Sequence, residues 1–119
     1  MIKIPESRQY NTGDHLRGHA DKDAFFEEII KEYHLREWFP LDSGIRVSYL
    51  FPLGDSHMLG GQGSDERVHM LFFRRVVVAS VIETRTDSNF VQFDYFFNQG
   101  TLEEKLGEAE RLREEKSKF

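Results

Sequence analysis

The chain has 119 residues, no cysteine and a formal net charge of −5, from 16 basic and 21 acidic side chains. Its length predicts a single domain spanning residues 1–119. The lack of cysteine excludes disulfides, thiolate metal ligands and cysteine nucleophiles. The acidic balance argues against a non-specific nucleic-acid binder, because such binding depends on neutralising phosphates. Eleven Phe, four Tyr and one Trp exclude a disordered chain.

The sequence also bears on where the protein works. No apolar run follows Lys3, so no signal peptide is expected. The longest apolar run, residues 76–82, is too short to cross a bilayer. Together with the lack of cysteine, these features predict a cytoplasmic protein with no membrane partner.

Two segments lie before the first strand. Residues 1–20 are polar and broken by Pro5 and Gly13, which predicts an irregular N-terminal arm. Residues 22–36 predict a helix, because five of their apolar side chains fall within about 140° of arc. These side chains are Phe25, Phe26, Ile29, Ile30 and Tyr33. Pro40 stops any continuation of the helix.

The next segment is a strand followed by a loop. Residues 45–53 alternate between apolar and other side chains, which predicts a half-buried strand. Residues 54–66 carry Gly54, Gly60, Gly61 and Gly63 and predict a long loop. The last three of these glycines can form a nest of backbone N–H groups for an anion, but a plain connector is the favoured interpretation.

Most of the apolar side chains lie between Val68 and Phe97. We expect one long strand over residues 68–85 with a bulge at Arg74–Arg75, since a two-residue hairpin would require positive φ at both arginines. A four-residue turn at 86–89 would then lead into a second strand over 90–98.

The expected register pairs Arg85 with Phe90. One face of the sheet, toward the helix, then carries Val78, Ile82, Val91, Phe93, Tyr95 and Phe97. The opposite face mixes apolar and polar side chains and includes Val81, Glu83 and Asp94.

Residues 101–119 predict a charged C-terminal helix, because Thr101 and Glu104 have the spacing of a capping box. The fold class is therefore α+β: an N-terminal helix packed on a three- to four-stranded antiparallel sheet, followed by a C-terminal helix. In order of elements alone, this resembles cystatin-like domains and small acidic secretion chaperones.

The mixed face leads to the first functional hypothesis. A monomer rarely exposes a large apolar patch, and aromatic side chains ringed by charges are typical of interfaces. The sequence therefore predicts a non-enzymatic protein-binding module: an inhibitor, adaptor or chaperone-like regulator that forms a homodimer and needs no cofactor. The predicted binding residues are Phe73, Arg75, Val81, Phe90, Gln92, Asp94 and Phe96.

A small hydrolase is the alternative hypothesis. Its candidate catalytic residues are His69, Glu83 and Arg85, since His and Glu can share proton transfer while Arg stabilises negative charge. In residue types and in its helix-on-sheet architecture, this set resembles small microbial ribonucleases.

A metal-assisted version of the hydrolase would use His15 and His19. Their i, i+4 spacing is that of metal ligands on a helix. Gly18 between them and the polar surroundings favour solvated loop histidines instead, so no metal is predicted. A third ligand would come from Asp14, Asp21, His34 or His57.

Overall fold

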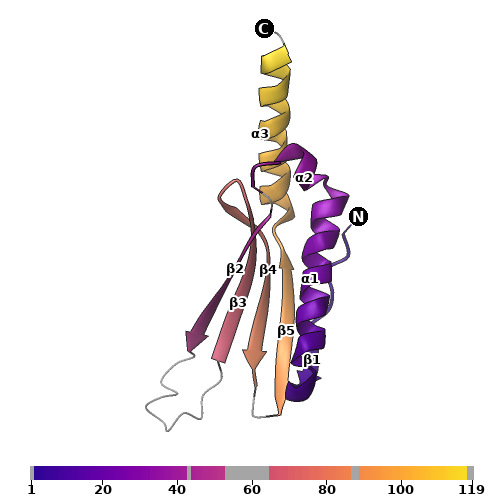
Figure 1. Cartoon of the computed structure of the whole chain (residues 1–119), viewed down its shortest axis with the longest axis vertical. Helices are drawn as coiled ribbons and strands as arrows, with labels where there is room; N and C mark the ends of the chain where they lie inside the picture. Colours follow the sequence, from indigo (N-terminus) through magenta and orange to yellow (C-terminus); the bar gives the residue numbers. More distant parts are fainter. Residues whose placement is uncertain (1, 43, 53–64, 87–88, 118–119) are drawn as a thin grey trace.

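The computed structural model describes residues 2–42, 44–52, 65–86 and 89–117 (Figure 1). They form an α+β fold, as predicted, with a five-stranded antiparallel sheet in the order β1-β5-β4-β3-β2. The elements in chain order are β1 (Arg8–Asn11), a 3-10 turn η1 (Thr12–Asp14), α1 (His15–Glu32), α2 (Leu35–Trp38), β2 (Ile45–Pro52), β3 (Asp65–Phe73), β4 (Val76–Arg85), β5 (Phe90–Phe97) and α3 (Gln99–Ser117). Among the helices of these residues, none has the length and apolar character needed to cross a membrane.

The N-terminal segment is more ordered than the sequence predicted. The expected irregular arm contains β1, which pairs with β5 so that Tyr10 lies opposite Val91. With β1 the sheet has five strands, whereas three to four were predicted. The first helix begins at His15, earlier than expected, and ends at Glu32. His34 then adopts a left-handed conformation (φ 54°) that separates α1 from the short α2.

The core lies between α1 and one face of the sheet, which we call the inner face. Phe25, Phe26, Ile29 and Ile30 of the predicted stripe are buried, whereas Tyr33 follows the end of α1 and is partly buried. Phe25 makes an edge-to-face contact with Tyr95, with ring centroids 5.3 Å apart. The buried inner-face side chains of the sheet include Leu71, Phe73, Ala79, Val81, Val91, Phe93 and Tyr95. Burying these apolar side chains is the main source of the stability of the fold.

The register between β4 and β5 differs from the expected one by one residue. Arg85 lies opposite Val91, not Phe90, and Val81 lies opposite Tyr95. The reason is that Thr86 still belongs to the ladder, since its backbone N–H donates to the Phe90 carbonyl. A slip of one residue exchanges the faces of a strand, so Val81 points toward α1. Residues 87–88 of the predicted turn lie outside the described residues.

The connection between β3 and β4 is a tight hairpin, where we expected a bulge. Arg74 and Arg75 are its two central residues, and both have positive φ, 55° and 66°. The backbone N–H of Arg74 donates to Asp42 Oδ2 at 2.9 Å, and the Arg74 guanidinium lies over the Phe39 ring. The irregularity in the ladder occurs at Leu71/Phe72.

The outer face of the sheet is formed by the side chains of β2–β5 that point away from α1. Of the predicted binding residues, Phe90, Gln92, Asp94 and Phe96 lie on it, because they alternate with buried side chains. The expected placement of two others on this face is wrong: Phe73 and Val81 are only 1% and 0% exposed and lie in the core. Arg75 is in the hairpin turn.

Most of the C-terminal helix α3 extends beyond the end of the sheet (Figure 1), and its base contacts β4. It continues upward from the end of β5, with Leu102 fully buried at its base. Farther along, Arg113 stacks on the Trp38 ring at 3.8 Å and donates to the Glu37 carbonyl at 3.1 Å. α3 is therefore held against α2.

Candidate functional site

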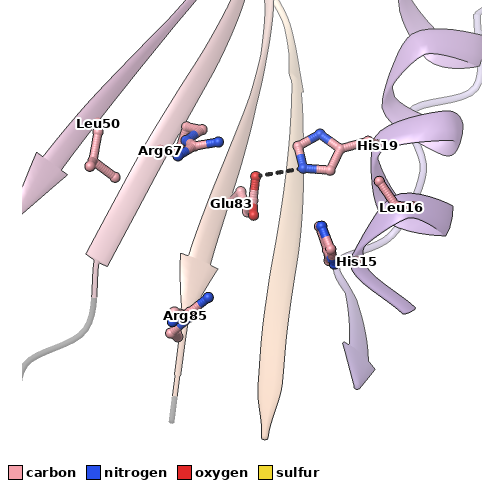
Figure 2. A pocket seen from close by; sticks show the side chains of 7 residues that line it. All are labelled: His15, Leu16, His19, Leu50, Arg67, Glu83 and Arg85. Atoms are coloured by element: carbon pink, nitrogen blue, oxygen red, sulfur yellow. Dashed lines mark ion pairs between the residues drawn. The ribbon is translucent and has the colours of Figure 1, made fainter. Parts of the chain in front are cut away.

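Three polar side chains from three elements meet on the inner face, and Figure 2 shows two of them, His19 and Glu83. His19 comes from α1, His69 from β3 and Glu83 from β4. Glu83 Oε1 lies 3.0 Å from His69 Nε2 and 3.3 Å from His19 Nε2. The side chains of His69 and Glu83 are 4% and 15% exposed, so this cluster is largely shielded from water.

Neighbouring side chains limit the histidine tautomers. Ser48 lies opposite His69 in the β2–β3 ladder, and its hydroxyl is 2.7 Å from His69 Nδ1. Lys22 Nζ lies 3.4 Å from His19 Nδ1. An ammonium group can only donate a hydrogen bond, whereas a hydroxyl can donate or accept one. His19 therefore accepts a hydrogen bond at Nδ1 and carries a proton on Nε2, which points to Glu83. For His69, Nε2 points to the same carboxylate, and the Ser48 hydroxyl at Nδ1 can donate or accept.

The surroundings shift the pKa values of two members of the cluster. Burial lowers the pKa of His19, against the opposing attraction of Glu83, so this imidazole is neutral at pH 7. Burial raises the pKa of Glu83, but the hydrogen bond from His69 and the positive charge of nearby groups, including Arg67, outweigh it. The net pKa of Glu83 lies below its usual value, and the carboxylate is ionised.

The cluster opens into a hollow of about 410 Å³. This volume falls within the range of small-molecule sites. Two arginines and one carboxylate line the hollow, so its fixed charge is positive and favours an anion. The lining residues are His15, Leu16, His19, Leu50, Arg67, Glu83 and Arg85.

The structure brings together two residue sets that the sequence offered separately. His69 and Glu83 were hydrolase candidates, and His19 was a metal candidate. Arg85 and His15 line the same hollow. Whether any of these residues acts in catalysis or binding stays a prediction.

The third metal ligand was expected elsewhere. Asp14, Asp21 and His34 are not part of the cluster, and His57 lies outside the described residues. Sequence reasoning also missed Ser48, Lys22 and Arg67. Alternation along β2 places Ser48 between Arg46 and Leu50 on one face, but only the pairing of β2 with β3 brings it to His69.

No protein-family model, curated protein or solved structure matches this chain. A function is therefore argued from the chemistry of the site alone.

Proposed function

We propose that this protein is a small hydrolase of phosphate esters that acts in the hollow beside Glu83. The observation that carries the proposal is the convergence of His19, His69 and Glu83 from three elements, next to the guanidinium groups of Arg67 and Arg85. Perturbed titratable groups in a concave site are typical of catalytic centres.

The charges favour a phosphate ester over other substrates. Guanidinium groups bind phosphoryl oxygens with two parallel hydrogen bonds and stabilise the charge of the transition state. Arg67 and Arg85 line the same wall as Glu83. Because the whole chain carries a net charge of −5, a small phosphodiester is a better substrate than a long polyanion.

The hydrolysis needs two proton transfers. The water oxygen bonds to phosphorus while the ester P–O bond breaks, so one proton must leave the water and one must reach the departing oxygen. Glu83 is ionised at pH 7, so its carboxylate can accept the proton from the water. His15 lies at the edge of the hollow with its Nδ1–H bonded to the Thr12 carbonyl at 2.9 Å, so its Nε2 carries a lone pair that can take up a proton and pass it on to the departing oxygen.

The proposal is tested with chromogenic phosphomonoesters and phosphodiesters, assayed with and without added divalent metals. Wild-type protein should hydrolyse at least one of them, and Glu83→Gln should lower kcat/KM by roughly 100-fold or more. Glu66→Gln is the matched control, because Glu66 lies on β3 and faces away from the hollow. No hydrolysis by the wild type, or equal activity in Glu83→Gln, would refute the proposal.

We also propose a second candidate function, protein binding through the outer face. Its support is the exposure of Tyr49, Phe90 and Phe96, at 52%, 37% and 47%. Patches of aromatic side chains of this kind mark interfaces. A second copy of the chain is the simplest partner, because most soluble oligomers are symmetric homo-oligomers.

A further inference from the structure

The ligand atoms of His19, His69 and Glu83 lie within 4.8 Å of one another. Both imidazole Nε2 atoms approach the same oxygen, Glu83 Oε1, at 3.0 and 3.3 Å. They come from α1, β3 and β4, so the packing of the helix on the sheet fixes their separation.

The two separations from Glu83 Oε1 are close to those around a tetrahedral ion. Zinc binds imidazole nitrogen and carboxylate oxygen at about 2.0–2.2 Å, which places neighbouring ligand atoms about 3.4 Å apart. The observed distances of 3.0 and 3.3 Å to Glu83 Oε1 are close to this value. A small outward movement of the carboxylate would make room for an ion between the three atoms.

We infer that His19, His69 and Glu83 bind a divalent transition-metal ion, with zinc as the best match. Two imidazoles and one carboxylate are ligands that zinc accepts, and three protein ligands leave one position open, as in catalytic zinc sites. The cluster opens into the hollow lined by Arg67 and Arg85, so the open position is available to water or to a phosphoryl oxygen.

The residues around the cluster suit this role. When a metal binds Nε2, the ring proton moves to Nδ1 and needs an acceptor. For His69 the acceptor is the Ser48 hydroxyl, 2.7 Å away. For His19, the neighbour at Nδ1 is the ammonium of Lys22, which cannot accept and must move aside. Lys22 therefore weakens the site.

A catalytic role for the ion rests on the proposed hydrolase function, but binding of the ion does not. With the metal in place, its water would lose a proton more easily and attack phosphorus, while Arg67 and Arg85 bind the other oxygens. Metal binding and hydrolysis are therefore measured separately.

The binding test is calorimetric titration of the untagged chain with zinc chloride. We expect one zinc ion per chain for the wild type and a loss of roughly 100-fold or more in affinity for His19→Ala and Glu83→Gln. His15→Ala is the matched control, because His15 lies one turn away on the same helix and is not among the three ligands. It should bind zinc like the wild type. Lys22→Gln should bind more tightly, by roughly threefold to tenfold.

The visible spectrum of the cobalt-loaded protein gives a second measurement. The intense bands of tetrahedral Co²⁺ should appear in the wild type and His15→Ala, and be lost in His19→Ala. Circular dichroism establishes that each variant is folded. No zinc binding by the wild type would overturn the inference. Equal losses of zinc affinity in His15→Ala and His19→Ala would also overturn it, because they would assign binding to these two histidines of α1.

A hydrolysis assay with EDTA separates the two proposals. Zinc binding without hydrolysis of any ester supports the metal site and refutes the hydrolase. Hydrolysis that survives EDTA, by protein that binds no zinc, supports the hydrolase and refutes the metal site.

Discussion

Gly18 allows α1 to approach the sheet closely enough for the site to form. A Cβ atom at this position would lie 2.3 Å from Cε2 of Phe93. Phe93 is fully buried and has no room to retreat. His19 follows Gly18 directly and spans the remaining gap to Glu83. In the sequence, Gly18 argued against a helix; in the structure it lies within α1, directly against the Phe93 ring of β5.

Gly18→Ala should therefore destabilise the protein. Overpacking typically costs about 1–3 kcal/mol, which outweighs the gain of about 1 kcal/mol that alanine brings to a helix. Urea denaturation measures the free energy of unfolding. Gly107→Ala is the matched control, since nothing lies within 4 Å of its added Cβ, and it should stabilise α3. Equal free energies of unfolding for the two variants would contradict this account.

The individual residues of the site were only partly predictable. The residue types of His69, Glu83 and Arg85 indicated acid–base chemistry, and the spacing of His15 and His19 indicated metal ligands. Their convergence depends on where α1 begins and on the pairing of β3 with β4, which places Arg67 opposite Glu83. Such long-range pairing leaves no mark in the local sequence pattern.

At the scale of elements, the β3–β4 hairpin contradicts local preference. Arginine is unfavourable at positive φ, which costs about 1–2 kcal/mol per residue, yet Arg74 and Arg75 both adopt it. The ladder on either side and the acceptor at Asp42 outweigh this cost. A prediction from turn propensity alone could not include those contacts.

Replacing Arg74 by Asn and Arg75 by Gly should stabilise the hairpin. Asn-Gly is the preferred pair in a two-residue turn of this type, and the backbone N–H that donates to Asp42 is kept. We expect a gain of about 1 kcal/mol or more in the free energy of unfolding, measured in urea. Asp42→Ala should lower it by about 1 kcal/mol. A less stable Asn-Gly variant would show that the arginine side chains hold the turn.

Glu27 connects three elements through ion pairs. Its Oε1 lies 2.7 Å from Arg36 Nη2 on α2 and 2.7 Å from Arg46 Nη2 on β2. The hydrogen bond from Arg36 is the main reason that the pKa of Glu27 lies below its ordinary value of 4.5, and Arg46 adds to it. Because the folded-state pKa is lowered, this contribution to stability is present above pH 4.5 and is lost as the pH falls through the folded value.

Glu27→Gln should thus remove part of the acid sensitivity of the fold. Thermal melts from neutral pH down to about pH 3 should show a smaller loss of Tm below pH 4.5 in the variant than in the wild type. Glu28→Gln, the next residue on α1 and exposed, is the control and should follow the wild type. Parallel curves for the wild type and Glu27→Gln would mean that the ion pairs do not affect stability.

At the scale of the whole molecule, the two faces of the sheet have different surroundings. α1 covers the inner face, while α3 contacts β4 at its base, extends beyond the sheet and reaches α2 through Arg113. The outer face keeps a half-exposed set of apolar side chains: Ile45, Tyr49, Phe90 and Phe96. The sequence predicted such a face from its aromatic content, but it assigned Phe73 and Val81 to it because the strand register was off by one residue.

If the outer face binds a second copy of the chain, the protein is a dimer at high micromolar concentration. Phe96→Glu should then yield a monomer, because it buries a new charge near Asp94 of the same face. Leu112→Glu is a matched control: Leu112 is 47% exposed, as is Phe96, but it lies on α3. Sedimentation velocity shows whether each of the two variants is a monomer or a dimer, and circular dichroism shows whether each is folded.

The outcome also separates the two candidate functions. A dimer that Phe96→Glu splits while ester hydrolysis is kept would mean that the outer face assembles the protein and the inner face carries the chemistry. A dimer that persists in Phe96→Glu would place the contact elsewhere. A wild-type monomer would remove self-association as the reason for the apolar outer face, since a symmetric contact must strengthen with concentration.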